Sequence, residues 1–119
     1  MGRQEIEDFI RSEFGVEGDR LWVRFPDYVV FRSKTNGKWF AVIMDVENRR
    51  LGLDGEGKTD IINLKCDPIL LGSLLQSRGF LPAYHMNKEK WVSILLDGSV
   101  PEKDVTDLIS FSYALIDGK

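Results

Sequence analysis

The amino-acid sequence predicts an α+β fold, in which a largely antiparallel sheet has helices packed on one face. Segments with strand-like alternation follow one another between residues 21 and 65 and are joined by short turns. Helical periodicity occurs near both ends of the chain and once in between. Strands that are grouped together, rather than alternating with helices, favour hairpins over a parallel sheet. The 119 residues suffice for one core, so we expect a single domain over residues 1–119.

The chain is expected to begin with an amphipathic helix over residues 4–14, which Gly15 ends. Its apolar residues share one helical stripe: Ile6, Phe9, Ile10 and Phe14. Leu21, Val23 and Phe25 then alternate with polar or bulky neighbours, which predicts a short strand that ends at Pro26.

A hairpin is predicted next, because residues 28–35 and 38–46 are rich in Val, Ile and aromatic residues. The two residues between these strands, Asn36 and Gly37, suit a type I′ turn, which needs a positive φ at both positions. Leu51 and Leu53 alternate within the glycine-rich residues 47–58 and suggest another short strand. Residues 59–65 are predicted to form the next strand.

The second half of the chain predicts two helices and one strand. Asp67 followed by Pro68 indicates a helix N-cap and a first helical residue, with the helix running to Arg78 before Gly79. Residues 90–96 are expected to form the last strand. Ser99 with Glu102 is the pattern of a capping box for a C-terminal helix. The inward-facing residues of that helix should be Val105, Leu108, Ile109 and Ile116.

Composition narrows the class of protein. The chain is 43% hydrophobic and 29% charged, which is typical of a folded, water-soluble domain. It has no apolar run of roughly 20 residues and no apolar leader, so we expect a cytoplasmic protein without a membrane partner. A single cysteine permits no internal disulfide, and one Cys with one His disfavours a structural zinc site. We therefore expect no metal and no cofactor.

The distribution of charge along the chain bears on whether the protein binds nucleic acid. The net charge of −3 argues against general electrostatic capture, but residues 32–65 carry seven basic and five acidic groups. Basic residues at the expected hairpin ends are candidates for contacts with DNA phosphates. These candidates are Arg32, Lys34, Lys38, Arg49, Arg50 and Lys58. Solvated charges at turns are an equally good explanation, and neighbouring carboxylates weaken the field, so binding should be modest and sensitive to salt.

Two residues could carry chemistry. Cys66 precedes the expected N-cap beside Lys65, where its thiol pKa could be lowered, and His85 could act as a base oriented by Asp67. A buried hydrophobic cysteine and a hydrogen-bonded structural histidine are the better interpretations. We expect no catalytic residue and no enzymatic activity. Trp22, Trp39 and Trp91 could stack on bases, although tryptophan on a strand is more often part of the core.

Two short polar segments stand out from this ordinary pattern. They are Asn63-Leu64-Lys65-Cys66-Asp67-Pro68 and Pro82-Ala83-Tyr84-His85-Met86-Asn87-Lys88. Trp91, Leu96-Asp97-Gly98-Ser99 and Ser112-Tyr113 follow them. As a set, these residues resemble the MmcQ/YjbR-like family over essentially the whole chain. Ala83 stands where the family usually has glycine, and Lys90 stands where a histidine commonly precedes the tryptophan.

The resemblance implies a frataxin-like (CyaY-like) α+β fold and a DNA-binding role through a double-wing arrangement, without an established catalytic activity. The residues that carry it define the motif patch: Asn63, Lys65, Cys66, Asp67, Tyr84, His85, Asn87, Lys88 and Trp91. An alternative function is a small anionic-ligand or protein-interaction module around Lys65 and His85, near a helix N-terminus. Either reading requires the two polar segments to converge on one exposed surface.

Overall fold

The computed structural model describes residues 1–117 and has a five-stranded antiparallel sheet with three α-helices, which confirms the expected fold class. The elements are α1 (Arg3–Phe14), β1 (Val29–Arg32), β2 (Trp39–Glu47), the 3₁₀ helix η1 (Asn48–Leu51), β3 (Lys58–Lys65), α2 (Pro68–Leu74), β4 (Phe80–Pro82), β5 (Trp91–Leu95) and α3 (Glu102–Ile116). No helix within residues 1–117 is both long and apolar enough to cross a membrane.

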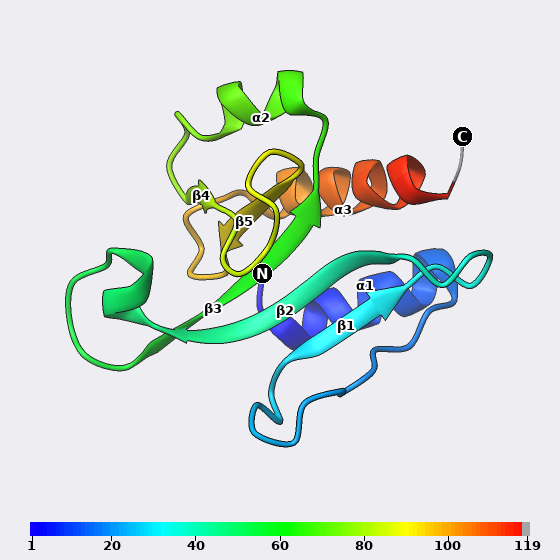
Figure 1. The fold of residues 1–119 in the computed structure, drawn as a ribbon, viewed down its shortest axis with the longest axis horizontal. Coiled ribbons are helices and arrows are strands. Elements are labelled where there is room, and N and C mark those ends of the chain that lie inside the picture. Colours follow the sequence, from blue (N-terminus) through cyan, green and yellow to red (C-terminus); the bar gives the residue numbers. More distant parts are fainter. Residues whose placement is uncertain (118–119) are drawn as a thin grey trace.

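The sheet has the strand order β1-β2-β3-β5-β4, and every neighbouring pair is antiparallel. The first three strands follow one another along the chain. After β3 the chain forms α2 and the edge strand β4, and it then returns as β5 between β3 and β4 (Figure 1). In the register, Asn63 of β3 lies between Val42 of β2 and Ser93 of β5. Because side chains alternate along a strand, these three residues share one face of the sheet.

Helices α1 and α3 cover one face of the sheet and lie behind it in Figure 1. Both helices place apolar residues on the strands, as their periodicity predicts. The buried residues of this layer include Ile6, Ile10, Val105, Ile109 and Ile116 from the helices and Val29, Phe31, Ile43, Ile62 and Ile94 from the strands. We refer to this side as the helix face.

The other face of the sheet, the open face, is covered by loops. Its apolar strand residues are Val30, Val42, Met44, Val46, Ile61 and Leu95. Trp22 and Tyr28, which precede β1, pack over these residues from one side, and Tyr84, which follows β4, packs over them from the other. Because side chains from loops rather than helices cover this face, it is where the fold can present variable groups to a partner.

The predicted strand over residues 21–25 is wrong. These residues form no strand: Val23 is 97% exposed, and Leu21 and Phe25 are each about half exposed. Asp19 pairs with Val30 across the free edge of β1 through two backbone hydrogen bonds, but the chain then leaves the sheet. Pairing with β1 therefore stops at Asp19, and the alternating residues that follow lie in a loop.

The β1–β2 hairpin is confirmed, but the predicted type I′ turn is wrong. Ser33 N–H donates to Lys38 O at 2.8 Å, and a four-residue loop lies between these two residues. Only Gly37 in this loop has a positive φ, of 73°. The side chain of Asn36 instead donates to Ile116 O at 2.7 Å and so ties the loop to the end of α3. A contact between residues 80 positions apart has replaced the local turn preference.

Two further local predictions fail. The expected strand at Leu51 and Leu53 is the 3₁₀ helix η1 followed by a turn. The expected capping box at Ser99 and Glu102 is absent, since Ser99 Oγ donates to Asp97 Oδ1 and Pro101 is the N-cap of α3. In both places a short-range hydrogen bond competes with the predicted pattern.

The segment after β3 is partly as expected. Asp67 Oδ1 accepts the Ile69 N–H at 2.8 Å, which confirms the N-cap, but α2 ends at Leu74 rather than near Arg78. The short strand β4 was not predicted. Gly79 precedes it with a φ of 90°, and a Cβ atom there would lie 2.6 Å from Val100. Gly79 therefore permits a close approach between β4 and the loop before α3.

One buried hydroxyl joins α3 to the sheet. Ser112 Oγ donates to Phe40 O at 2.6 Å and accepts the Lys65 N–H at 2.9 Å, and it is fully buried. It therefore bridges the backbones of β2 and β3 at the end of their ladder.

We predict that Ser112→Ala lowers the free energy of unfolding by about 1–3 kcal/mol, because it leaves a buried carbonyl and a buried N–H without a partner. Urea titration followed by circular dichroism measures this loss. Ser110→Ala changes an exposed serine of the same helix and should have almost no effect. Equal stability of the two variants would contradict the bridging role.

Candidate binding site on the open face

A closed triangle of hydrogen bonds holds the second polar segment on the open face. Asn63 Nδ2 donates to Tyr84 O at 2.9 Å, Tyr84 N–H donates to Ser93 Oγ at 2.9 Å, and Ser93 Oγ donates to Asn63 Oδ1. Both Asn63 and Ser93 are fully buried. The two polar strand residues thus satisfy each other and the backbone of the loop, and the loop is fixed on the sheet.

His85 follows this anchor in an unusual conformation. Its φ is 58°, and it is the only non-glycine residue with a positive φ among residues 1–117. This region is costly for a residue with a Cβ atom, so it persists because the surrounding structure imposes it. The rings of Tyr84 and His85 lie next to each other, with centroids 4.0 Å apart at an interplanar angle of 50°.

His85 lines a cleft of about 400 Å³ around the end of β2. The lining residues come from the segment before β1, from β2 and β3, and from the loop after β4: Phe25, Tyr28, Asp45, Val46, Glu47, Arg50, Lys58, Tyr84 and His85. A second hollow shares Phe25, Tyr28 and His85 with this cleft and adds Trp22 and Trp39. The site therefore combines an aromatic wall, formed by Phe25 and Tyr28, with a charged end, formed by Arg50, Lys58 and the carboxylates beside them.

The charged end of the cleft is built from ion pairs. Arg50 Nε lies 3.1 Å from Glu47, Arg49 lies 3.6 Å from the same carboxylate, and Lys58 Nζ lies 3.4 Å from Asp45. The hydrogen bond from Arg50 and the charge of Arg49 lower the pKa of Glu47. Because two guanidinium groups share one carboxylate, one positive charge remains available for an anion. Exposed pairs of this kind add little to stability and exchange partners readily.

Two tyrosines, Tyr28 and Tyr84, line the same cleft. Loss of solvent around Tyr28 and the nearby Tyr84 raise the pKa of Tyr28, which therefore stays a neutral donor at physiological pH. The contact of Arg50 with Glu47, and then with Tyr84, raises the pKa of Arg50. The cleft thus offers hydrogen-bond donors at its charged end. Elsewhere it offers the edges and faces of aromatic rings.

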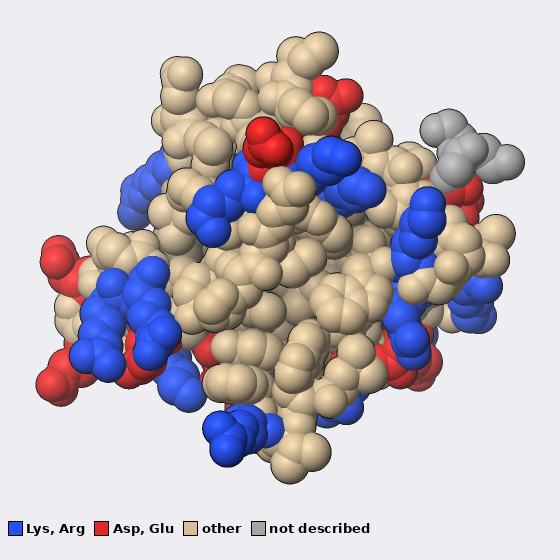
Figure 2. Space-filling model, viewed as in Figure 1, with Lys and Arg blue, Asp and Glu red and all other residues tan. Residues whose placement is uncertain are grey.

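The six basic residues predicted to contact DNA form two groups at opposite ends of β2. Arg32, Lys34 and Lys38 lie around the β1–β2 turn, and Arg49, Arg50 and Lys58 lie around the β2–β3 connection. The nine residues of β2 separate the groups by roughly 27 Å. Arg32 is paired with Asp19 at 2.6 Å, and Lys34 Nζ lies close to Gly15 at the end of α1. Figure 2 shows Lys and Arg in separate groups around a hollowed centre without charges.

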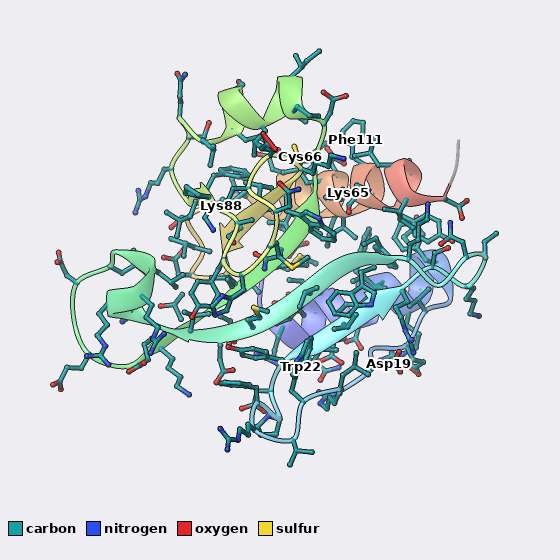
Figure 3. All side chains as sticks on the ribbon, viewed as in Figure 1. Asp19, Trp22, Lys65, Cys66, Lys88 and Phe111 are labelled. Atoms are coloured by element: carbon teal, nitrogen blue, oxygen red, sulfur yellow. The ribbon has the colours of Figure 1, made fainter. Side chains whose placement is uncertain are left out.

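The two segments of the motif patch do come together on the open face. Asn63 contacts Tyr84 directly, and Lys65 lies opposite Trp91 in the β3–β5 register. Asn87 O accepts the Trp91 N–H at 3.0 Å, which holds the end of the loop that carries Lys88. Figure 3 shows Lys65 and Lys88 in front of the upper part of the sheet. His85, however, faces Arg50 and Lys58 in the cleft.

Cys66 and Asp67 belong to a different part of the molecule. Cys66 is buried and packs against Leu71 of α2 and Val92, below α2 in Figure 3. Val92 points to the helix face, so Cys66 and His85 lie on opposite sides of the sheet and form no dyad. Burial, and then the charge of Asp67, raise the pKa of the Cys66 thiol. Asp67 caps α2 and does not orient His85.

The aromatic wall of the cleft was not among the predicted site residues. Phe25 and Tyr28 are stacked, with ring centroids 4.6 Å apart at 13°, and Phe25 is 47% exposed. The signal in the sequence is the density of aromatic residues over residues 22–28, which the strand interpretation of residues 21–25 concealed.

The fold, the buried hydrogen-bond triangle and the motif patch together define a class of small α+β proteins with one helix-covered face and one loop-covered face. The family model of YjbR matches residues 12–115, and this chain belongs to the YjbR family. The expected family is thus confirmed.

Relatives match most of the chain. It is 40% identical over 113 residues to the uncharacterized protein YyaQ of Bacillus subtilis, which covers 95% of this chain and 96% of the relative. It is 31% identical over 88 residues to the uncharacterized protein YjbR of Escherichia coli K12, covering 73% and 66%, respectively.

Solved structures agree with the fold. A crystal structure of a protein from Pseudomonas syringae has a TM-score of 0.94 and 42% identity, and the match covers 97% of this chain and 98% of that one. A protein from Deinococcus radiodurans shares the fold with a TM-score of 0.76 at 22% identity. The likeness to frataxin stays a prediction.

We predict that Asn63→Ala lowers the free energy of unfolding by about 2–3 kcal/mol, because the Tyr84 carbonyl loses its donor and the buried Ser93 hydroxyl loses its acceptor. Ser93→Ala should cost about 1–2 kcal/mol for the same reason. Because both residues belong to one triangle, the double variant should lose less than the sum of the two. Urea titrations of the three variants measure this coupling, and strict additivity would contradict the closed triangle.

We also predict that Cys66 in the native protein reacts slowly with a thiol reagent at pH 8. Burial raises its pKa, so the native state holds less thiolate than the unfolded state at the same pH. Reaction rates in buffer and in denaturing urea measure the difference. Similar rates in both conditions would show that the thiol is accessible in the native state.

Proposed function

We propose that this chain is a non-enzymatic DNA-binding protein and that it contacts DNA with the open face of its sheet. The observation that carries the proposal is the pair Arg49 and Arg50, which share the single carboxylate of Glu47 beside an aromatic cleft. A phosphate oxygen can replace that carboxylate at either guanidinium group, because both present N–H donors with the same geometry.

The spacing of the basic groups supports the same proposal. The two ends of β2 lie roughly 27 Å apart, and the phosphates of each strand repeat about every 3.4 Å along the axis of duplex DNA. About eight base pairs of a duplex therefore span both groups. The remaining cations of the motif patch, Lys65 and Lys88, lie in front of the upper part of the sheet (Figure 3).

The carboxylates of the cleft limit the affinity. Glu47 and Asp45 compete with phosphates for their basic partners, and the chain has a net charge of −3. Binding that depends on a few exchanged ion pairs falls steeply with added salt.

A second candidate function is the binding of a small anionic molecule or a protein by the motif patch. The cleft beside His85 favours it, since 400 Å³ lies within the range of small-ligand sites, about 300–1,000 Å³. A thermal-shift screen with inorganic and organic anions tests this function, because a ligand of the folded state raises the melting temperature. Unchanged melting temperatures across the anions would count against it.

We predict that labelled DNA binds at low salt and that the double variant Arg49→Ala/Arg50→Ala binds more weakly. Fluorescence anisotropy over a series of salt concentrations measures both effects. The slope of log K against log salt should fall by about 1.8 in the variant, since each lost phosphate contact removes about 0.9. Lys103→Ala removes an exposed cation from α3 on the helix face and serves as the matched control. No binding of DNA at low salt would end the proposal.

Replacing the competing carboxylate should act in the opposite direction. Glu47→Gln releases both guanidinium groups while keeping the size of the side chain, so we predict tighter DNA binding and a steeper salt dependence. Asp107→Asn, which frees Lys103 on α3, is the matched control and should leave binding nearly unchanged. Equal effects of the two variants would show that only net charge matters.

A further inference from the structure

We infer that the cleft between Phe25 and His85 holds one unpaired nucleotide, with its base on the aromatic wall and its phosphate at Arg50 and Lys58. This inference rests on the proposed function and specifies it, because it makes single-stranded DNA the preferred partner. The chemistry it requires is a nucleobase joined to a phosphate, which either a DNA strand or a free mononucleotide supplies.

The aromatic wall provides the surface for a base. Phe25 and Tyr28 form a parallel stack, and Phe25 leaves about half of its surface exposed to the cleft and solvent. Tyr84 and His85 supply a second pair of rings that line the same space. Exposed rings next to cationic groups are the recurring means by which proteins bind single strands, because every base has a face that stacks.

The charged end provides the place for the phosphate. Arg50 and Lys58 both line the cleft, and each is held by a carboxylate that is itself partly exposed. When a phosphate takes Arg50, Glu47 keeps Arg49 as a partner, whereas Asp45 must share Lys58 with the phosphate. The hydroxyl groups of the two tyrosines that line the cleft can donate or accept hydrogen bonds with the sugar or the base edge.

The conformation of His85 supports a role for its ring in this cleft. The hydrogen-bond triangle of Asn63, Ser93 and Tyr84 holds the preceding residue, and His85 follows it with a φ of 58°. A glycine would adopt this backbone without cost, yet the position carries an imidazole that lines the cleft. Strain kept at the rim of a ligand-sized cavity is the pattern of a binding site.

The cleft can accept a base from a single strand but not a base from duplex DNA. A base that is paired and stacked within a duplex cannot enter a cavity on the protein surface, whereas an unpaired base can. The wall and the charged end therefore act together only on an unpaired nucleotide. The phosphates of a duplex can reach Arg49 and Arg50, but no base of the duplex then stacks on the aromatic rings.

The test compares three ligands at one low salt concentration: an oligothymidylate of about twelve nucleotides, a duplex of the same length, and thymidine monophosphate. Anisotropy of labelled DNA measures the first two, and tryptophan fluorescence of Trp22 and Trp39 beside the cleft measures the third. We expect the oligothymidylate to bind at least about tenfold more tightly than the duplex.

Two variants remove the rings without disturbing the fold. Phe25→Ala changes a half-exposed side chain, and His85→Gly suits the positive φ of its backbone. Each should weaken single-strand binding roughly tenfold and leave duplex binding unchanged. Phe111→Ala removes an aromatic ring that is 60% exposed on α3, and it is the matched control with no expected effect.

The outcomes separate the two claims. Duplex binding that equals or exceeds single-strand binding and is unaffected by the ring variants overturns this inference and leaves the proposed function in place. Fluorescence changes with thymidine monophosphate alone, lost in His85→Gly, support the cleft as a mononucleotide site and overturn DNA as its partner. The absence of any response to all three ligands overturns both claims.

Discussion

The open face of this protein depends on one buried hydrogen-bond triangle. Burying an asparagine and a serine side by side on neighbouring strands is costly unless every polar atom finds a partner. Asn63 and Ser93 meet this condition by binding each other and both backbone groups of Tyr84. The loop after β4 consequently has only one position on the sheet. The ring of His85 and one side of the cleft follow from that position.

The triangle also explains why the two faces of the sheet differ. On the helix face, apolar side chains of α1 and α3 complete a dry core, and Ser112 joins α3 to the strands through a fully satisfied hydroxyl. On the open face, a polar anchor holds a loop, and an aromatic segment before β1 closes the other side. Rigid helices thus support a surface made of loops, which is the usual arrangement for presenting binding groups.

The sequence predicted those features that depend on neighbouring residues. The N-cap at Asp67 and the strands β2, β3 and β5 needed only local chemistry and alternation. The turn at Asn36 failed because its amide binds Ile116, a partner that no local pattern reveals. The motif segments predicted a shared surface, but the sharing of Glu47 by two arginines and the aromatic wall depend on tertiary packing. Hence the convergence of Asn63 and Lys65 with the loop after β4 was predictable, while the separate location of Cys66 and Asp67 and the chemistry of the cleft were not.

The pairing of charges in the cleft determines what kind of ligand it can select. A small inorganic anion that reaches Arg50 must displace Glu47, so it exchanges one ion pair for another with little net gain. A ring without a charge stacks on Phe25 but leaves the charged end unchanged. A ligand that carries both an anion and an aromatic ring exchanges the ion pair at Arg50 and also gains the free energy of stacking on Phe25. Competition from the carboxylates therefore raises the threshold for binding and favours molecules that join an aromatic group to an anion.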